Sequence, residues 1–295
     1  MTAVRVADIV ARTAPLGVRF WDTAARRPIT DGLVVTAWHR ARPGRVLTLR
    51  PNASFGHVLH AAPGLSRSAL GDGQEAFWAN PPEQAAFTLE VHDRLSRFLP
   101  LRLDATLPHQ GWFVPDCLTS PPSSPVEPGA IHRDVPSGFV PLFAAVGRTG
   151  SGNQGVILAT LRDGDDATPA AWAVVVAEAR GRIAGVGVAD VQGELSMLFP
   201  FPELERRPFI FGSPIEAPLA SRSGGALPVL ATDVTLRVFH SGLPKAVPDF
   251  CQLMGQTERG LVGSRSPSSG LGSVRLVLGR PLFLHSEGSR NLHVD

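Results

Sequence analysis

The stretch GVGVADVQGELSMLFPFPE, residues 185–203, alternates small and large apolar residues around one aspartate and a further glycine. Alternation with a period of two is typical of β-strands, whereas the paired glycines raise the alternative of a loop that holds a ligand. Asp190 and Gly193 suit a tight turn, because the carboxylate can accept hydrogen bonds from loop amides and glycine can take a positive φ. We therefore predict a strand, a hairpin turn and a second strand.

The same pattern extends along the whole chain of 295 residues, which contains 30 glycines and 27 prolines. Helix-breaking residues at this frequency leave only short apolar runs, rich in Val, Leu and Phe, and such runs favour strands. The sequence predicts an all-β protein with strands at residues 16–21, 33–39, 45–50, 56–61, 86–93, 99–107, 154–162, 171–179, 183–190, 194–199, 233–240 and 272–279.

The length of the chain favours two domains. A Pro/Ser-rich segment, residues 115–138, separates two sets of strands and is typical of a linker. We expect two tandem antiparallel β-sandwiches, one over 1–114 with an N-terminal arm and one over 139–295. The second contains loops at 200–232 and 241–271 that are longer than a compact domain normally needs, so we expect them to carry function.

The two halves share a sequence pattern. Pro28 precedes ITDGLVVTAW and Pro169 precedes AAWAVVVAEA, so each half has a turn proline before a buried strand. Downstream, NASFGHVLHAAPG (52–64) parallels DVQGELSMLFPFPE (190–203), with an Asn or Asp, a glycine, alternating apolar residues and then proline.

On these residues, GVRFWDTAARRPITDGLVVTAW and PNASFGHVLHAAPG, the chain resembles carboxypeptidase regulatory-like or transthyretin-like β-sandwich modules. The resemblance implies an Ig-like or transthyretin-like fold in each half and, because such modules are usually non-catalytic, a structural or binding role. The segments FTLEVHDRLSRFLPLRL and VPLFAAVGR are also similar to accessory structural proteins of phage-tail-like contractile injection systems. That second resemblance implies protein partners within a larger particle.

Motifs that carry chemistry in other proteins are incomplete here. GSGNQG (150–155) has the glycine spacing of a dinucleotide-binding loop, but the apolar run that follows is too short for the required helix. DGDD (163–166) lacks the later oxygen ligands of a calcium loop. His57 and His60 would point to opposite faces of a strand, so they could not bind the same metal ion. We therefore expect no cofactor and no metal. A hydrolase whose catalytic triad is assembled across loops is kept as the second alternative to a structural role.

Composition excludes several classes of partner. A net charge of +2 without a cluster of basic residues argues against nucleic acid. No run of about 18 apolar residues is present to span a membrane.

Asp8 interrupts the segment where an export signal needs an apolar core, so we expect a cytoplasmic protein, or one released later within a particle. Cys117 and Cys251 form no CxxC pair, so we expect two reduced, inert thiols.

Five tryptophans and no tyrosine are present. Trp21, Trp38 and Trp172 lie in or beside predicted strands, which favours core packing, whereas Trp78 and Trp112 lie near loops. Exposed aromatic rings would suit a carbohydrate-binding module, which is the first alternative to a structural role, although sugar platforms commonly recruit tyrosine as well.

The leading expectation is a non-enzymatic structural or adaptor protein that contacts other proteins. Within the loop 241–271, the segment PDFCQLMGQ (248–256) places Phe250, Leu253 and Met254 on one face of a short helix. This apolar face either docks a partner protein or caps the open end of the second sandwich, and the sequence leaves both alternatives open.

Overall fold

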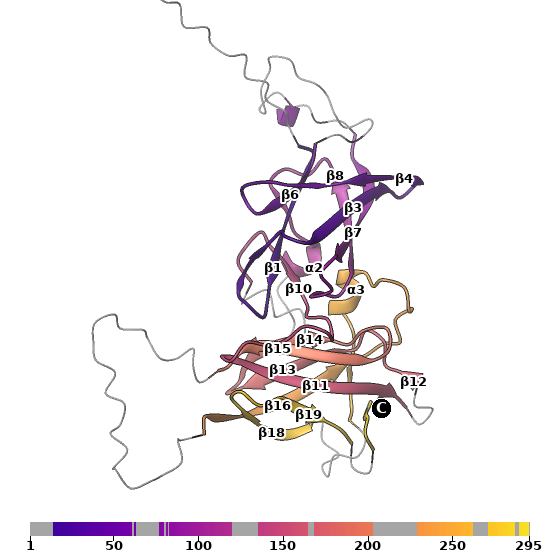
Figure 1. The fold of residues 1–295 in the computed structure, drawn as a ribbon. Coiled ribbons are helices and arrows are strands. Elements are labelled where there is room, and N and C mark those ends of the chain that lie inside the picture. Colours follow the sequence, from indigo (N-terminus) through magenta and orange to yellow (C-terminus); the bar gives the residue numbers. More distant parts are fainter. Residues whose placement is uncertain are drawn as a thin grey trace, which may run out of the picture.

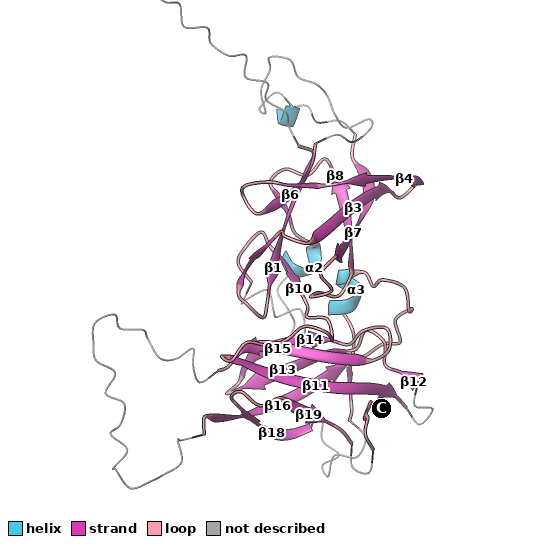
Figure 2. Ribbon diagram, in the orientation of Figure 1, coloured by secondary structure: helices cyan, strands magenta, loops and turns pink. Residues whose placement is uncertain are grey.

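The computed structural model describes residues 14–60, 62, 77–79, 81, 83–119, 135–164, 168–202, 229–261, 271–286 and 289–294. These residues form several sheets, mostly antiparallel, with only short helices between them (Figures 1 and 2). The all-β prediction is therefore confirmed. None of the described helices is long and apolar enough to cross a membrane.

Two sheets are built from strands that precede residue 143. The central strand of one sheet is β1 (Leu16–Asp22), and its other members are β2 (Arg27–Ile29), β5 (Arg50–Pro51), β6 (Gly56–Leu59), β9 (Trp112–Phe113) and β10 (Val140–Leu142). The other sheet has four strands in the order β4 (Arg42–Thr48), β3 (Leu33–His39), β7 (Ala85–Asp93) and β8 (Leu101–Leu107). We call this part of the molecule the first half.

Two further sheets, the second half, use strands from residue 154 onward. The centre of one is β11 (Gln154–Asp163), accompanied by β12 (Thr168–Pro169), β15 (Glu194–Pro200), β19 (Leu282–Leu284) and β20 (Leu292–Val294). The other contains β14 (Arg182–Val188), β13 (Val174–Ala179) and β16 (Ala231–Phe239), with β17 (Glu258–Arg259) and β18 (Leu271–Val277) both paired to β16. Two short helices, α2 (Asp116–Thr119) and α3 (Phe250–Met254), lie between the halves (Figure 2).

The second half repeats the strand pairings of the first. Both β1 and β11 pair with a short proline-bearing strand, with one later antiparallel strand and with two short parallel strands near the end of their half. Trp21 lies opposite Pro28, and Arg162 lies opposite Pro169, so the two turn prolines occupy corresponding registers. In the same way, β3 lies between β4 and β7 as β13 lies between β14 and β16. The shared sequence pattern thus reflects a repeated topology.

The turn in the opening stretch has the predicted chemistry. Asp190 Oδ1 accepts hydrogen bonds from the backbone amides of Gln192 at 2.8 Å and Glu194 at 3.0 Å. Gly193 has a φ of 79°, and a Cβ there would lie 2.4 Å from the carbonyl oxygen of Leu161. Glycine is required at this position both by the backbone conformation and by the close approach of β11.

The corresponding turn of the first half uses the same bonds. Asn52 Oδ1 accepts from the amides of Ser54 and Gly56, both at 3.0 Å, which matches the two acceptor contacts of Asp190. The residue with the left-handed backbone conformation in this turn is Phe55, with a φ of 57°. Phe55 therefore occupies the position that Gly193 has in the second half, and Gly56 comes one residue later.

The predicted hairpin is wrong in one respect, because β14 and β15 belong to different sheets. They are joined by a single bridge, Ala189 to Leu195, next to the turn. A Cβ on Gly185 would lie 2.6 Å from Phe199 Cβ, and one on Gly187 would lie 2.7 Å from Met197 Cβ. The two glycines therefore let β14 pack closely across the side chains of β15, and the opening stretch is a corner between two sheets.

The strand that follows the predicted boundary at residue 139 pairs with the first half. Val140–Leu142 forms β10, which pairs in parallel with β1, and Ala144 bridges to Phe98, so the chain is still part of the first half here. Residues 120–134 of the predicted linker and 203–228 of the predicted loop 200–232 lie outside the described residues.

Two large hydrophobic clusters hold the molecule together. One lies between the two sheets of the second half. The other fills the first half and continues onto the outer face of the β13–β14–β16 sheet, where it includes Trp172, Val174, Val176, Val186, Val188 and Phe239. The halves therefore share one continuous apolar core at their junction, with α3 lying against the first half (Figure 1).

Candidate functional site: the junction and its groove

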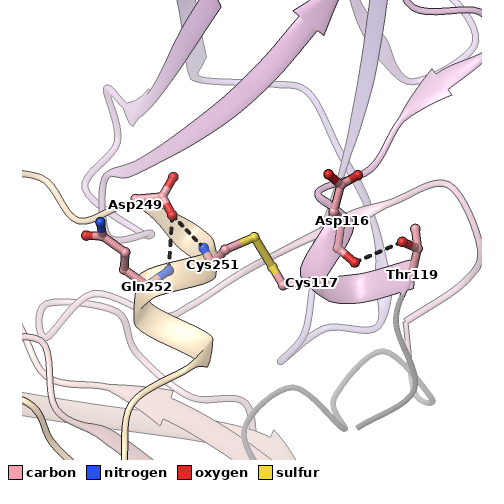
Figure 3. The surroundings of a disulfide bond; sticks show 6 residues. All are labelled: Asp116, Cys117, Thr119, Asp249, Cys251 and Gln252. Carbon is pink, nitrogen blue, oxygen red and sulfur yellow. Dashed lines mark hydrogen bonds between the residues drawn. A yellow bond between two sulfur atoms is a disulfide. The ribbon is translucent and has the colours of Figure 1, made fainter.

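The helix α3 is present over the predicted residues. Asp249 caps its N-terminus, because Asp249 Oδ1 accepts from the amides of Cys251 and Gln252 at 3.0 Å each (Figure 3). The three side chains predicted as a partner-binding face, Phe250, Leu253 and Met254, are buried in the core that the two halves share.

Phe250 packs against the first half. Its ring stacks on that of Phe143, with 6.4 Å between the ring centres. Arg102 on β8 donates its backbone amide to the carbonyl of Pro248 at 2.9 Å and bridges to Asp249, so the segment before α3 runs beside the edge of β8. The apolar face of α3 thus contacts the other half of the same chain, an arrangement that neither sequence-based alternative included.

A disulfide joins the halves at the same place. Cys117 on α2 is bonded to Cys251 on α3 across a sequence separation of 134 residues (Figure 3). The prediction of two reduced thiols is therefore wrong. Separation in sequence gives no information on distance in space, and the docking of α3 brings the two Cα atoms to 5.6 Å. The one sequence signal was an even number of cysteines.

Trp172 anchors the loop that leads into α3. Its side chain is 3% exposed, its φ is 62°, and its indole Nε1 donates to the carbonyl oxygen of Pro244 at 3.0 Å. The carbonyl oxygen of Trp172 accepts from Gln256 Nε2 at 2.7 Å. The predicted burial is confirmed, although Trp172 lies in the shared core and not inside the second half.

A buried ion pair holds the end of β1 against the segment that leads into the second half, and a hydrogen bond to β11 lies beside it. Asp22, at the end of β1, accepts from the amides of Ala24 and Ala25 through Oδ1, and from Arg148 Nη2 at 2.6 Å through Oδ2. Gln154, the first residue of β11, donates from Nε2 to the carbonyl of Ala24 at 2.6 Å. The motif GSGNQG therefore ends in a contact between halves and leads into a strand, not into a helix.

A groove with a volume of about 350 Å³ lies beside the junction. Its floor is the outer face of the β3–β7–β8 sheet, and its roof is the segment that leads into α3. We call this hollow the junction groove. It is lined by Trp38, Thr88, Arg102, Asp104, Leu243, Pro244, Ala246, Val247, Pro248, Asp249 and Gln252.

The floor of the groove is held by charge pairs. Arg102 Nε donates to Glu90 Oε2 at 2.7 Å, and His92 Nε2 contacts Glu90 Oε1 at 2.5 Å. Burial raises the pKa of Glu90, but the hydrogen bonds from His92 and Arg102 outweigh it, so the pKa is lowered and the carboxylate stays ionised. An ionised Glu90 holds the Arg102 guanidinium in place.

Sequence reasoning missed the groove because it placed Trp38 in the core. Val35 and Ala37 point into the core of the first half. Because successive side chains of a strand point to opposite faces, Trp38 lies on the outer face of the sheet, where it is half-buried. The Arg102 guanidinium lies 5.8 Å from the centre of the Trp38 ring, within the range of a cation–π contact. Asp104 pairs with Arg40 on the same face.

The histidines do not form a metal site in the part of the chain that the structure describes. His57 is buried, whereas His60 is exposed, and no group of three His, Cys, Asp or Glu side chains is close enough there to hold an ion. Both ring nitrogens of His57 are without a hydrogen-bond partner, and burial lowers its pKa to about 4.

Comparison of the chain with protein-family models, with curated proteins and with solved structures finds no match. The resemblances to carboxypeptidase regulatory-like modules and to accessory proteins of injection systems therefore stay predictions.

Proposed function

We propose that this chain is a non-enzymatic structural or adaptor protein, built as two tandem β-sandwich modules that are fixed into one rigid body. In this proposal it positions partner proteins within a larger assembly, of which a contractile injection particle is one example.

The junction between the halves is the observation that supports this proposal. An apolar core shared by both halves, the hydrogen bond from Gln154 to Ala24 and the Cys117–Cys251 disulfide all restrain relative motion. Domain pairs that close on a substrate need a mobile interface, whereas a restrained interface suits a spacer that keeps its partners at a fixed separation.

Sheet edges are the proposed contact surfaces. In the sheet with the order β4–β3–β7–β8, as far as the structure describes it, β4 is the edge strand and pairs with β3 alone. The Val46 side chain on β4 is 58% exposed. Unpaired backbone groups on such an edge can accept a strand from another protein.

The disulfide also bears on where the protein works. Disulfides persist in oxidising environments and are rare in the cytosol. We infer that the chain acts outside the cytosol, which agrees with a component that is released within a particle and modifies the expectation of a cytoplasmic location.

The test is isolation of native assemblies with the tagged full-length chain, followed by mass spectrometry of the copurifying proteins and electron microscopy of the sample. We expect a defined particle that contains the chain in fixed stoichiometry, both before and after a high-salt wash. A chain that purifies alone from its native source under all conditions would contradict the proposal.

A further inference from the structure

We propose that the junction groove is a binding site for a neutral saccharide of one or two rings. This inference goes beyond the proposed structural role, because a rigid spacer needs no ligand.

Among the residues that line the groove, Trp38 is the one that offers a flat aromatic ring. Trp38 lies on the outer face of β3 and is half-buried, so one part of the indole remains accessible beside the groove. A sugar ring presents a face of C–H groups that packs well on a flat aromatic surface, while its hydroxyl groups remain free for hydrogen bonds at the rim.

Side chains that can bond hydroxyl groups surround this ring. Asp104 offers carboxylate lone pairs besides the one that accepts from the Thr88 hydroxyl at 3.3 Å, and that hydroxyl can itself accept a hydrogen bond. Gln252 offers an amide with both donors and acceptors, and Arg102 offers further N–H donors besides the Nε that bonds Glu90. Arg102 and Asp104 are already held by partners on the sheet, which lowers the entropy cost of ordering them around a ligand.

Charge and size restrict the class of ligand. The charged lining residues are Arg102, Asp104 and Asp249, so the groove has no excess of positive charge that would attract an anion. Its volume of about 350 Å³ is at the small end of ligand sites and suits one or two sugar rings.

An extended peptide fits the groove less well. The floor is the face of a sheet in which β3, β7 and β8 already pair with one another. The edge of β8 is occupied at Arg102, whose amide bonds the carbonyl of Pro248. A peptide that binds by adding a strand needs free backbone groups, whereas a saccharide can be recognised by side chains alone.

The roof of the groove is fixed by the junction. Pro248 and Asp249 precede α3 directly, and Cys251 ties α3 to α2. Reduction of the disulfide should therefore loosen the roof and weaken binding while it leaves the floor of the groove intact.

The experiment titrates the oxidised full-length chain with maltose, cellobiose, lactose and chitobiose, using saturation-transfer NMR and calorimetry. We expect saturable binding of at least one of these sugars, about tenfold weaker in Trp38→Ala and in Gln252→Ala. Gln252 is exposed, so its substitution should not disturb the fold. Trp78→Ala, a change of another half-buried tryptophan outside the groove, is the matched control and should bind as the wild type does.

The proposal is overturned if none of the four sugars binds the wild-type chain, or if Trp38→Ala and Gln252→Ala both bind as tightly as the wild type. Binding restricted to sulfated or phosphorylated sugars on a glycan array would also overturn the assignment to a neutral ligand. Incorporation of these variants into native assemblies reports on the structural role separately.

Discussion

Cys117 and Cys251 lie on two short helices from different halves of the molecule, and the bond between them closes a covalent loop over 134 residues of sequence. The bond adds to a junction that already contains the stacked rings of Phe143 and Phe250. The halves are therefore joined both by covalent chemistry and by a shared apolar core, and this combination has consequences for cleavage and for stability.

Cleavage of the chain between its two cysteines should leave the halves together. A site for a specific protease, inserted between Ser123 and Ser124, allows this cut within the Pro/Ser-rich stretch. We expect one band on a non-reducing denaturing gel and two bands after reduction, because the disulfide spans the cut. The variant Cys117→Ser/Cys251→Ser with the same insertion is the control and should give two bands in both gels. Separation of the fragments without a reductant would show that the disulfide does not form.

The same double variant should be less stable than the wild type without losing its fold. A loop of this length is expected to contribute about 4–5 kcal/mol through the restricted entropy of the unfolded chain. Urea unfolding followed by circular dichroism measures this difference, and the far-ultraviolet spectrum before unfolding should be unchanged. An unaltered unfolding midpoint would contradict a stabilising role for the disulfide.

Trp172→Ala should cost about 3–5 kcal/mol, because it removes a large side chain from the core shared by the two halves. The substitution also removes the donor to the carbonyl of Pro244, so the loop before α3 loses an anchor. Thermal unfolding of this variant is compared with that of Trp78→Ala, whose side chain is only half-buried and outside the shared core. Equal melting temperatures for the two variants would contradict the anchoring role.

The sequence predicts the strands well where they are long enough to show a period. The predicted strand at 33–39 matches β3, and the one at 154–162 differs from β11 by one residue. The short parallel strands, such as β10 at Val140–Leu142, are too brief for any periodic pattern, and their pairing with β1 depends on tertiary contacts. The predicted start of the second domain at residue 139 did not take account of β10, which pairs with β1.

The candidate site was less predictable than the fold. The alternation of inward and outward positions along β3 does predict that Trp38 faces outward, since Val35 and Ala37 occupy the inward positions on the same strand. The roof of the groove does not follow from local sequence, because it depends on α3 crossing from the second half onto the first. The apolar pattern of α3 identified a docking face but could not identify the surface that it covers.

Removal of the charge on Arg148 should destabilise the chain through Asp22. Asp22 is 2% exposed, so Arg148→Met leaves a buried carboxylate without its ion-pair partner, at an expected cost of about 3–5 kcal/mol. The double variant Asp22→Asn/Arg148→Met should recover part of that stability, because asparagine keeps an oxygen for the amides of Ala24 and Ala25. Urea unfolding of the wild type, both single variants and the double variant gives the coupling free energy, and purely additive effects would contradict the pairing.

Acid should weaken the first half through His57. Burial lowers the pKa of His57 from 6.5 to about 4, so the unfolded chain binds a proton at a higher pH than the folded chain does. The free energy of unfolding should therefore fall as the pH drops below 6.5, and His57 should contribute no further loss once the pH is below about 4. The shift corresponds to about 3 kcal/mol in total.

The variant His57→Phe isolates this effect, because it places another ring beside Phe20, which His57 meets edge-on at 5.7 Å between ring centres. We expect the difference in stability between the wild type and His57→Phe to change by about 3 kcal/mol between neutral pH and about pH 4, in the direction that favours the variant in acid. His60→Phe, a change at an exposed histidine on the same stretch of chain, is the control and should follow the wild type. Parallel stability curves for the wild type and His57→Phe over this pH range would show that His57 is not buried as a neutral ring.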